Sequence, residues 1–484
     1  MVMNTGKQEL DEIVRELFPN AAVNKPLSRS HKLPGVPQRI WEYFVLRYVD
    51  GHPEDTPDEM AARVDSMLRV ARQRIPEPGS HNDTLNSLRI NGEVELIDAV
   101  TVEINVRTME PVARSQHFGT HVPIEVSNEI IEANQRMLLR PVWGRVLYVW
   151  NGDTIQIYEF EEIQNTNIRL SEFALARQHL SRDEWIGLLV RSVGLNDEWL
   201  DDEAKWHVVS RLLPLVEPRL HIMEPGPKET GKTTTYTNLD ARVSIVTGLD
   251  VTLAKLIYDG ARHTPGLLGR NTDGVVVFDE LQNGRDRRNV AELAGQLKQV
   301  MESGRIERLN FRDETDTSIV FVGNTLARGD QVHQLFPAPF REAAFLSRIA
   351  GMLDGHRMPM LERGDISLAQ GVGLTCDYFS EVLRQLRGET APQQLLARVN
   401  ITNCSNRDER AVRRLVSAYV KLLHPDGNVT DQELHEISQR AVSLRIPIAQ
   451  AAARAEGGIP PDIRVEVRDF ETPLESIEGT GGDN

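Results

Sequence analysis

The feature that most constrains this 484-residue chain is the segment Gly226-Pro-Lys-Glu-Thr-Gly-Lys-Thr233, which follows the short run Arg219–Glu224. Glycines let consecutive backbone N–H groups curl around an anion without a Cβ in the way. A helix that begins at such a loop adds its unpaired N–H groups and the positive end of its dipole. The spacing G-x-x-x-x-G-K-T therefore predicts a phosphate-binding loop between a buried strand and a helix.

The residue types in this loop predict that it binds ATP together with Mg²⁺. Lys232 is expected to reach the β- and γ-phosphates, and the Thr233 hydroxyl is expected to ligate Mg²⁺. The other loop positions are expected to cradle the phosphates: Gly226, Pro227, Lys228, Glu229, Thr230 and Gly231. The alternative is a glycine-containing turn that matches the pattern by chance, so the rest of the chain has to decide.

Two apolar runs downstream favour a nucleotide hydrolase. The first begins at Gly274 and ends in Asp279 and Glu280, and the second begins at Ser318 and ends in Asn324. Such runs are typical of buried parallel strands, whose carboxyl ends bind ligands in open α/β sheets. Asp279 would hold Mg²⁺, Glu280 would deprotonate the attacking water, and Asn324 would position that water. Each run alone is compatible with ordinary core, but the three elements in this order predict ATP hydrolysis.

Composition indicates a globular protein of about three domains. Apolar residues make up 40% of the chain and charged residues 26%. The two cysteines, Cys376 and Cys404, argue against a disulfide framework or a thiolate zinc site and suit a reducing cytosol. The sequence shows neither a signal peptide nor an apolar run near the roughly 18 residues of a membrane span, so we expect a cytoplasmic protein without a membrane partner.

The formal net charge of −16 bears on DNA binding. It weighs against a protein that coats DNA with its whole surface, but it is compatible with a basic channel inside an acidic ring.

The apolar pattern predicts an α/β fold, with an AAA+ P-loop core, a parallel sheet and a helical lid after a mixed helical and β-rich module. The expected segments are an N-terminal DNA-binding module over 1–170, the nucleotide-binding core over 171–362, the lid over 363–455, and an acidic, disordered tail over 456–484.

The N-terminal module is expected to combine amphipathic helices with a set of half-buried strands. Helices are predicted over 8–18, 38–49 and 57–74, the last with Thr56 as its N-cap. Strands are predicted over 93–97, 100–106, 144–150 and 155–160, and they indicate a barrel of OB type whose closure the sequence leaves open. The basic segment 24–34 beside the aromatic helix is either a nucleic-acid contact or a solvated connection beside core aromatics.

Further helices are expected over 171–193, 203–213 and 290–301, and a hairpin is expected over 303–314. The hairpin carries the candidate DNA-phosphate contacts Arg305, Arg308 and Arg312. These arginines alternate with acidic residues, so a salt-bridged solvated face is the alternative. The cluster Arg285-Asp-Arg-Arg288 is open to the same two interpretations.

Two more arginines are candidates for nucleotide contacts. Arg348 is placed to be an arginine finger, which neutralises charge on the γ-phosphate and is supplied by a neighbouring subunit in ring ATPases. Lid helices are predicted over 376–386, 393–399, 407–423 and 431–445. Arg407, at the start of the third of these, would reach back to the nucleotide. A locally paired surface arginine is the alternative for both residues.

These segments resemble the BrxL family, the Lon-protease-like AAA+ components of BREX phage-exclusion systems. The segment Glu184–Gly194 looks like the entry to that family's ATPase core. Three further matches are the nucleotide motifs Gly226–Thr233, Val277–Glu280 and Val320–Asn324. The lid resemblance lies in Arg407–Arg414 and Lys421–Gly427, and weaker similarity extends to Phe18-Pro-Asn and Val36–Val49, so about 15–445 is covered.

The resemblance implies a DNA-binding homo-oligomeric ring, as a hexamer or stacked hexamers, that works with other BREX components in antiviral defence. The segment Leu346-Ser-Arg-Ile349 is similar to the finger segment of MCM-type helicases. Longer family members carry a Lon-like protease domain, for which too few residues follow the last lid helix here, so peptidase activity is not expected.

Two other functions stay open at this level. A protein unfoldase that feeds a separate peptidase would need aromatic pore residues, and Phe311 is the sole aromatic of the hairpin segment. A nucleotide-gated scaffold or repressor would need no complete set of water-handling residues.

Overall fold

The computed structural model describes most of the chain. The described residues are 5–30, 36–50, 56–77, 79–105, 108–119, 121–138, 141–163, 168–237, 239, 242–249, 251–261, 263–270, 272–280, 287–325, 337–362, 364–391 and 393–468. The chain forms two compact units, the first comprising 1–168, 188–196 and 368–381 and the second comprising 169–187, 197–367 and 382–484. The expected segment boundaries at 170, 362 and 455 stay a prediction.

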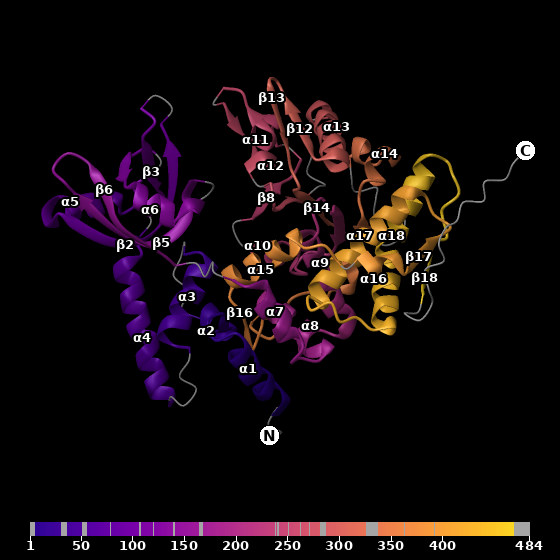
Figure 1. Ribbon diagram of the computed structural model, residues 1–484, viewed down its shortest axis with the longest axis horizontal. Helices are drawn as coiled ribbons and strands as arrows, with labels where there is room; N and C mark the ends of the chain where they lie inside the picture. Colours follow the sequence, from indigo (N-terminus) through magenta and orange to yellow (C-terminus); the bar gives the residue numbers. More distant parts are fainter. Residues whose placement is uncertain are drawn as a thin grey trace, which may run out of the picture. The chain divides into compact units, whose positions relative to one another are not determined.

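The first unit contains a closed five-stranded barrel with the strand order β2-β3-β4-β6-β5 (Figure 1). Its strands are β2 (Glu93–Ile104), β3 (Pro111–Ser115), β4 (Ile124–Val126), β5 (Val142–Trp150) and β6 (Ile155–Glu162). Neighbours are antiparallel except β4 and β6, and the helix α6 (Asn128–Ala133) lies between β4 and β5 in the chain. The barrel is therefore closed, a point that the sequence left open.

The core cluster of the barrel is apolar, and the buried carboxylate of Asp98 lies among its strands. Asp98 accepts hydrogen bonds from Tyr148 Oη (2.8 Å), from the backbone nitrogen of Ala99 (2.7 Å) and from the hydroxyl of Ser115. Burial raises the pKa of Asp98, although these hydrogen bonds oppose the increase. The two strands predicted over 93–97 and 100–106 form the single strand β2, while β3 and β4 were not predicted because both are short.

Helices make up much of the rest of the first unit. They are α1 (Thr5–Leu17), α2 (Lys25–Arg29), α3 (Gln38–Tyr48), α4 (Pro57–Arg74), α5 (His81–Asn91) and the 3₁₀ helix η1 (Gln135–Leu138). The predicted N-cap is confirmed, because the Thr56 side chain accepts from the backbone of Glu59, whose carboxylate binds back to Thr56. The aromatics of α3 are mainly core, since Trp41 and Phe44 are buried. The pair β1 (Ala22–Asn24) and β16 (Val372–Leu374) completes the unit.

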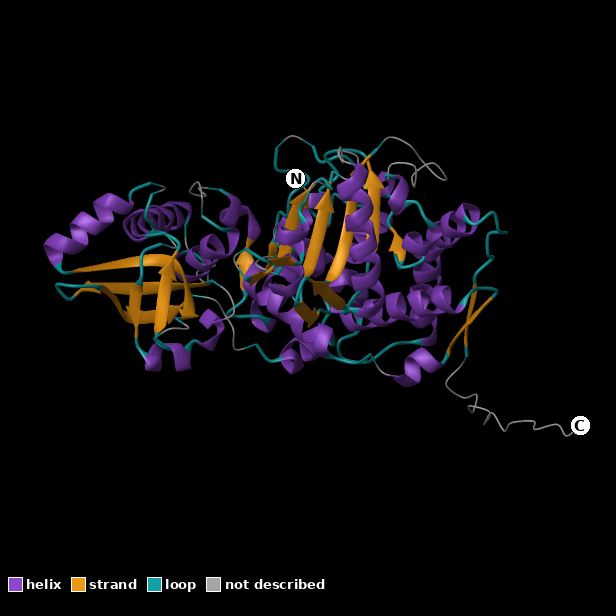
Figure 2. Cartoon of the chain, turned by 90° about the horizontal axis from the view of Figure 1, so that it is seen from above, coloured by secondary structure: helices purple, strands orange, loops and turns teal. Residues whose placement is uncertain are grey.

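The second unit is built on a five-stranded parallel sheet with the order β15-β7-β14-β11-β8 (Figure 2). Its strands are β7 (Ile222–Gly226), β8 (Val243–Thr247), β11 (Val275–Asp279), β14 (Ser318–Asn324) and β15 (Gly351–Met352). Counted along the chain, the spatial order is fifth, first, fourth, third, second. Phe278, Phe321 and Phe345 belong to the core cluster of this sheet. Because the strands are parallel, the ends of β7, β11 and β14 that carry the predicted site residues share one edge.

The chain between residues 170 and 357 also forms helices. They are α7 (Leu170–Arg177), α8 (Arg182–Ser192), α9 (Asp202–Val216), α10 (Lys232–Thr237), α11 (Leu253–Leu256), α12 (Leu267–Arg270), α13 (Arg287–Ser303), α14 (Ala343–Leu346), η4 (Ala338–Phe340) and η5 (Gly355–Arg357). The end of α8, from residue 188, belongs to the first unit. The single helix predicted over 171–193 was wrong, because the chain turns at 178–181 and the Ser181 hydroxyl accepts from the backbone of Glu184 at the start of a second helix. Two hairpins, β9 (Tyr258–Asp259) with β10 (Thr264–Pro265) and β12 (Arg305–Arg308) with β13 (Phe311–Glu314), are also present.

The predicted helices after the sheet are present, with changed ends. They are α15 (Cys376–Gly388), α16 (Gln393–Ala397), α17 (Asn406–Leu423) and α18 (Asp431–Ala455). The helix α18 continues ten residues past the predicted end at Arg445 and contains Pro447. The region is not purely helical, because β17 (Val399–Thr402) pairs with β18 (Arg464–Val467). Of the disordered tail expected over 456–484, residues 456–468 are described and include β18, whereas 469–484 lie outside the described residues.

Candidate nucleotide site

The predicted phosphate-binding loop lies at the carboxyl end of β7 and leads directly into α10. Glu229 and Gly231 have φ angles of +61° and +73°, and such left-handed residues in a loop help to turn successive N–H groups toward a common point. Gly226 is required for a different reason from the one expected. A Cβ there would lie 2.6 Å from the Cα of Gly355, so close backbone packing excludes a side chain.

Lys232, which is predicted to contact the bound phosphates, lies over the phosphate-binding loop. Its Nζ contacts the carbonyl oxygen of Gly226 (3.3 Å), the Thr230 hydroxyl (3.3 Å) and the carbonyl oxygen of Pro227. Burial lowers the pKa of this ammonium, and the charge of Glu224 opposes the shift. Lys228 and Glu229 are exposed, so they belong to the loop through their backbone.

The two predicted Mg²⁺ ligands are brought together. Thr233 Oγ1 lies 2.7 Å from Asp279 Oδ2, although the two residues are 46 positions apart. A hydroxyl beside a carboxylate is a donor set that suits Mg²⁺, which prefers oxygen ligands. The residues present therefore fit a nucleotide-bound Mg²⁺.

The two predicted water-handling residues are at the same sheet edge. Glu280 follows Asp279 with a φ of +55°, and its backbone nitrogen donates to Asp279 Oδ1 (2.8 Å). Asn324 is the register partner of Gly226 across β14 and β7, and the next residue, Thr325, donates to the carbonyl oxygen of Gly226 (2.9 Å). The left-handed conformation of Glu280 is uncommon for a glutamate, and it changes the direction of the Glu280 side chain relative to the strand β11 that precedes it.

A buried network under the loop was not predicted from the sequence. Arg211, on α9, donates to both carboxylate oxygens of Glu224 (2.6–3.1 Å), to the carbonyl oxygen of Thr230 (3.0 Å) and to Thr235 Oγ1 (3.3 Å). His207 Nε2 lies 2.9 Å from Glu224 Oε1. Arg211 and Glu224 are both 0% exposed, so one guanidinium links the strand, the loop and the helix of the phosphate-binding segment.

The charges in this network are matched. Burial would raise the pKa of Glu224, but the positive charge of Arg211, together with His207, holds it well below its usual value. Burial lowers the pKa of His207, against the effect of Glu224. The sequence signal for this arrangement was a basic residue within the mainly apolar run Val208–Val216 of α9.

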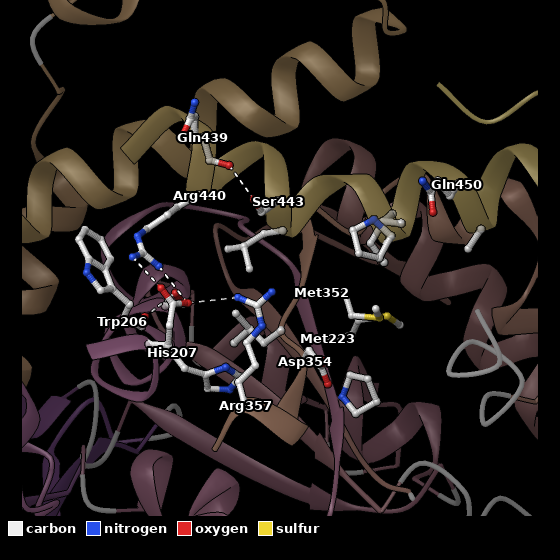
Figure 3. A pocket seen from close by; sticks show the side chains of 18 of the residues that line it. Trp206, His207, Met223, Met352, Asp354, Arg357, Gln439, Arg440, Ser443 and Gln450 are labelled. Atoms are coloured by element: carbon white, nitrogen blue, oxygen red, sulfur yellow. Dashed lines mark hydrogen bonds and ion pairs between the residues drawn. The ribbon is translucent and has the colours of Figure 1, made fainter. Parts of the chain in front are cut away.

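A cavity of about 490 Å³ begins beside the loop (Figure 3). Pro225, the residue before the loop, forms part of its wall, together with Met223 and Met352. Figure 3 shows Gln439, Arg440, Ser443 and Gln450 of α18 along one side of the cavity and Trp206 and His207 of α9 opposite. The Arg440 guanidinium lies 4.2 Å from the centre of the Trp206 ring and 3.0 Å from the Glu203 carboxylate, which also pairs with Arg357.

The two arginines predicted to contact nucleotide are not at this edge. Arg348 Nε lies 3.0 Å from Glu302 Oε2, and Arg407 Nη2 lies 3.8 Å from the same oxygen. Arg407 also donates to the Ser347 hydroxyl (3.1 Å). The structure therefore places Arg348 and Arg407 together, near the residues that precede β15.

The three hairpin arginines differ in their surroundings. Arg305 and Arg312 are exposed, with side chains 65% and 83% accessible and cross-strand carboxylates 3.9 Å away. Arg308 instead donates to the carbonyl oxygen of Tyr258, whose ring stacks on Phe311 at 4.5 Å. The side chains of the cluster 285–288 lie outside the described residues.

Two known protein families match this chain. Residues 155–458 match the family described as Lon-like protease BrxL-like, ATPase domain, so the sheet and its site lie in an ATPase domain of the Lon-like class. Residues 16–150 match the BREX system Lon protease-like protein BrxL N-terminal family. The chain belongs to the BrxL family.

Two curated relatives carry the name Lon-like protease BrxL. The relative from Escherichia coli O9:H4 (strain HS) is 26% identical over 493 residues, which cover 98% of this chain and 69% of the relative. The relative from Bacillus cereus (strain H3081.97) is 25% identical over 458 residues, which cover 91% of this chain and 66% of the relative. The chain therefore spans about two thirds of the length of these relatives. Within the described part of the chain, none of the helices is both long and apolar enough to cross a membrane.

Proposed function

We propose that this protein is an AAA+ ATPase of the P-loop type that hydrolyses ATP with Mg²⁺. The observation that carries the proposal is the 2.7 Å contact between Thr233 and Asp279, at the edge where Asn324 lies in register with Gly226. Three segments distant in the sequence thus supply the phosphate loop with Thr233, the carboxylate of Asp279 and the amide of Asn324. The sheet order, with the first strand between the fifth and the fourth, supports the same class.

Each residue has a defined part in this reaction. Lys232 and the loop N–H groups neutralise phosphate charge, while Thr233 and Asp279 hold the Mg²⁺ that binds with the nucleotide. Glu280 accepts the proton of the attacking water at its carboxylate, and the Asn324 amide orients that water. The bound metal ion supplies charge neutralisation on the phosphate oxygens. The cavity lined by Pro225, Trp206 and Arg440 takes the nucleoside part of ATP.

The protein acts as a homo-oligomeric ring, a hexamer or stacked hexamers. This part of the proposal rests on Arg348, a finger candidate that lies away from the phosphate loop of its own chain. Heterologous contacts between identical subunits close into rings, and they would bring Arg348 to a neighbouring site.

The ring couples ATP hydrolysis to loading or movement on DNA in BREX-type antiphage defence, together with other BREX components. The barrel is the proposed DNA-binding module, and its strand order, its single parallel pair and its helix after the third strand support the OB type. Trp150 and Tyr158, which are 37% and 70% exposed, are its candidate stacking groups for DNA bases. The hairpin supplies Arg305 and Arg312 as phosphate contacts.

The stacked Phe311 disfavours the unfoldase alternative. Its ring lies parallel to that of Tyr258, with an angle of 5° between the planes, so the sole aromatic of the hairpin is engaged within the protein. A pore residue that grips protein substrates has to be exposed.

The proposal is tested with matched variants. Lys232→Ala should abolish binding of a fluorescent ATP analogue and turnover, whereas Lys255→Ala, an exposed lysine outside the loop, should change both less than about threefold. Glu280→Gln should retain binding and lose turnover, because an amide cannot accept the proton. A wild-type protein without turnover would refute the ATPase proposal, and equal non-zero turnover by wild type and Lys232→Ala would refute the loop as its site.

A further inference from the structure

Two arginines of one chain converge on a single carboxylate of the second unit. Glu302 Oε2 lies 3.0 Å from Arg348 Nε and 3.8 Å from Arg407 Nη2. Arg407 is tied to the same segment a second time, through its 3.1 Å hydrogen bond to the Ser347 hydroxyl. The three side chains come from α13, from the segment before β15 and from the first turn of α17.

This cluster lies at the opposite edge of the sheet from the phosphate loop. The loop follows the carboxyl end of β7, whereas Arg348 precedes β15, which runs parallel to β7 with Gly351 opposite Ile222. The backbone nitrogen of Ala350 donates to the carbonyl oxygen of His221, at the amino end of β7. A five-residue strand is about 16 Å long. Neither arginine is therefore near the loop of its own chain.

A buried ion pair fixes the start of α17 at this edge. Arg445 of α18, which is 1% exposed, donates to Asp408 (2.8 Å), to the carbonyl oxygen of Ser347 (3.3 Å) and to that of Ile349. Asp408 is also the residue that completes the N-terminal capping box of α17 with Ser405. Moving Arg407 to its own loop would break these contacts, and removing one partner of a buried ion pair is costly.

We propose that Arg407 acts together with Arg348 on the nucleotide of a neighbouring subunit, and that Glu302 is the positioning residue that holds both. This rests on the ATPase and ring proposed above, and it replaces the expectation that Arg407 reaches back to the nucleotide of its own chain. One carboxylate between two guanidinium groups relieves their mutual repulsion. The three side chains together carry one net positive charge, which suits an incoming anion.

Mixed assemblies test which subunit Arg407 serves. Lys232→Ala and Arg407→Ala chains, each with a different affinity tag, are co-expressed, and tandem purification isolates assemblies that contain both. Each variant alone should be inactive. If Arg407 acts on the neighbouring subunit, a site is active when its loop comes from an Arg407→Ala chain and its arginine comes from a Lys232→Ala chain. In a ring with random order, each condition holds for about half of the sites, so up to about a quarter of the sites should hydrolyse ATP.

Three outcomes would overturn the inference. The mixture would stay as inactive as the single variants if Arg407 served its own chain, and Arg407→Ala alone would keep wild-type turnover if it had no role. If no mixed assembly can be recovered, the proposed homo-oligomeric ring would be refuted as well. A wild-type protein without turnover would instead refute the ATPase proposal itself, so the two failures are distinguishable. Replacing Lys232→Ala by Glu280→Gln repeats the test with a chain that is expected to bind nucleotide.

The role of Glu302 has a separate readout. Glu302→Gln should lower kcat by tenfold or more with little change in KM, while Glu292→Gln, an exposed glutamate on the same helix, should match wild type. In mixtures, Glu302→Gln should regain turnover with Lys232→Ala. It should not regain turnover with Arg407→Ala, because Glu302→Gln and Arg407→Ala chains both fail to supply the arginines to a neighbouring site. Recovery with Arg407→Ala, or an unchanged kcat in Glu302→Gln, would contradict the positioning role.

Discussion

Arg211 shows how a single buried side chain can set the shape of a phosphate loop. Its guanidinium contacts Glu224 before the loop, Thr230 within it and Thr235 after it. The ion pair is fully buried, where a charge that loses its partner is poorly solvated. Its removal should therefore affect both stability and nucleotide binding.

We expect Arg211→Leu to destabilise the second unit by about 3–5 kcal/mol, because Glu224 would be left without its main partner. The double variant with Glu224→Leu should recover much of this loss, since no unpaired carboxylate remains. Urea unfolding of the three proteins measures both effects. Nucleotide affinity should stay reduced in the double variant, because Thr230 still lacks its donor; full recovery of affinity would argue against a role for Arg211 in holding the loop.

A pH dependence is expected from His221, which is buried at the start of β7. Its Nδ1 accepts from the backbone nitrogen of Ile319 (3.0 Å), and burial holds its pKa well below the usual value. Because the pKa of His221 is lowered in the folded chain, the unfolded chain takes up the proton first as the pH falls. The contribution of His221 to the free energy of unfolding is therefore fully present above about pH 6.5. Below that pH it is lost at up to about 1.4 kcal/mol per pH unit. Denaturant midpoints between pH 7.5 and 5.5 measure the slope. His221→Gln should have a shallower slope than the exposed variant His435→Gln; equal slopes would contradict the assignment.

At the scale of elements, the three arginines of the hairpin β12–β13 have different surroundings. Arg308 and the Tyr258–Phe311 stack join β12–β13 to β9–β10, whereas Arg305 and Arg312 extend from the exposed face. The sequence pattern placed the three arginines in one class, and the structure separates them.

We expect Arg305→Ala with Arg312→Ala to weaken duplex DNA binding and to lower the salt slope of log K by about 0.9 for each lost phosphate contact. Fluorescence anisotropy at several salt concentrations measures the slope. Glu307→Gln with Glu314→Gln, which removes the cross-strand carboxylates, is the matched control and should bind at least as tightly as wild type. An unchanged slope in the arginine variant would assign these residues to a solvated face instead.

The elements with strong periodicity or clear caps were predictable from the sequence. The helix α4 with its Thr56 cap, the hairpin over 305–314 and the strands that end in Asp279 and Asn324 are examples. Short strands such as β4 were not, because three residues carry no measurable period. The pairing of Thr233 with Asp279 followed from motif order, whereas the roles of Arg211 and Glu302 depend on long-range contacts that no local pattern encodes.

At the scale of the whole molecule, the proposed ring makes the site complete only when a second copy supplies Arg348. The proposal therefore predicts that ATP turnover per chain rises with protein concentration until assembly is complete. Arg348→Ala should lose this rise and reduce turnover on the order of a thousandfold, with nucleotide binding retained.

Turnover measured over a dilution series, alongside light scattering for mass, tests this expectation. The exposed Arg341→Ala, seven residues earlier in the same segment, is the comparison and should follow the wild-type curve. Constant turnover per chain in a range where the mass falls to that of one protomer would show that each chain is self-sufficient.

The closure of the barrel has a consequence for anything that binds to it. Each strand from β2 to β6 has a hydrogen-bonding neighbour on both sides, although the β4–β6 ladder joins only Glu125 with Gln156 and Val126 with Ile157. Where the ladders are formed, no backbone donors and acceptors are left for a guest to add a strand alongside. Recognition at those segments has to come from side chains and loop tips, which can be exchanged one at a time without disturbing the strands that carry them.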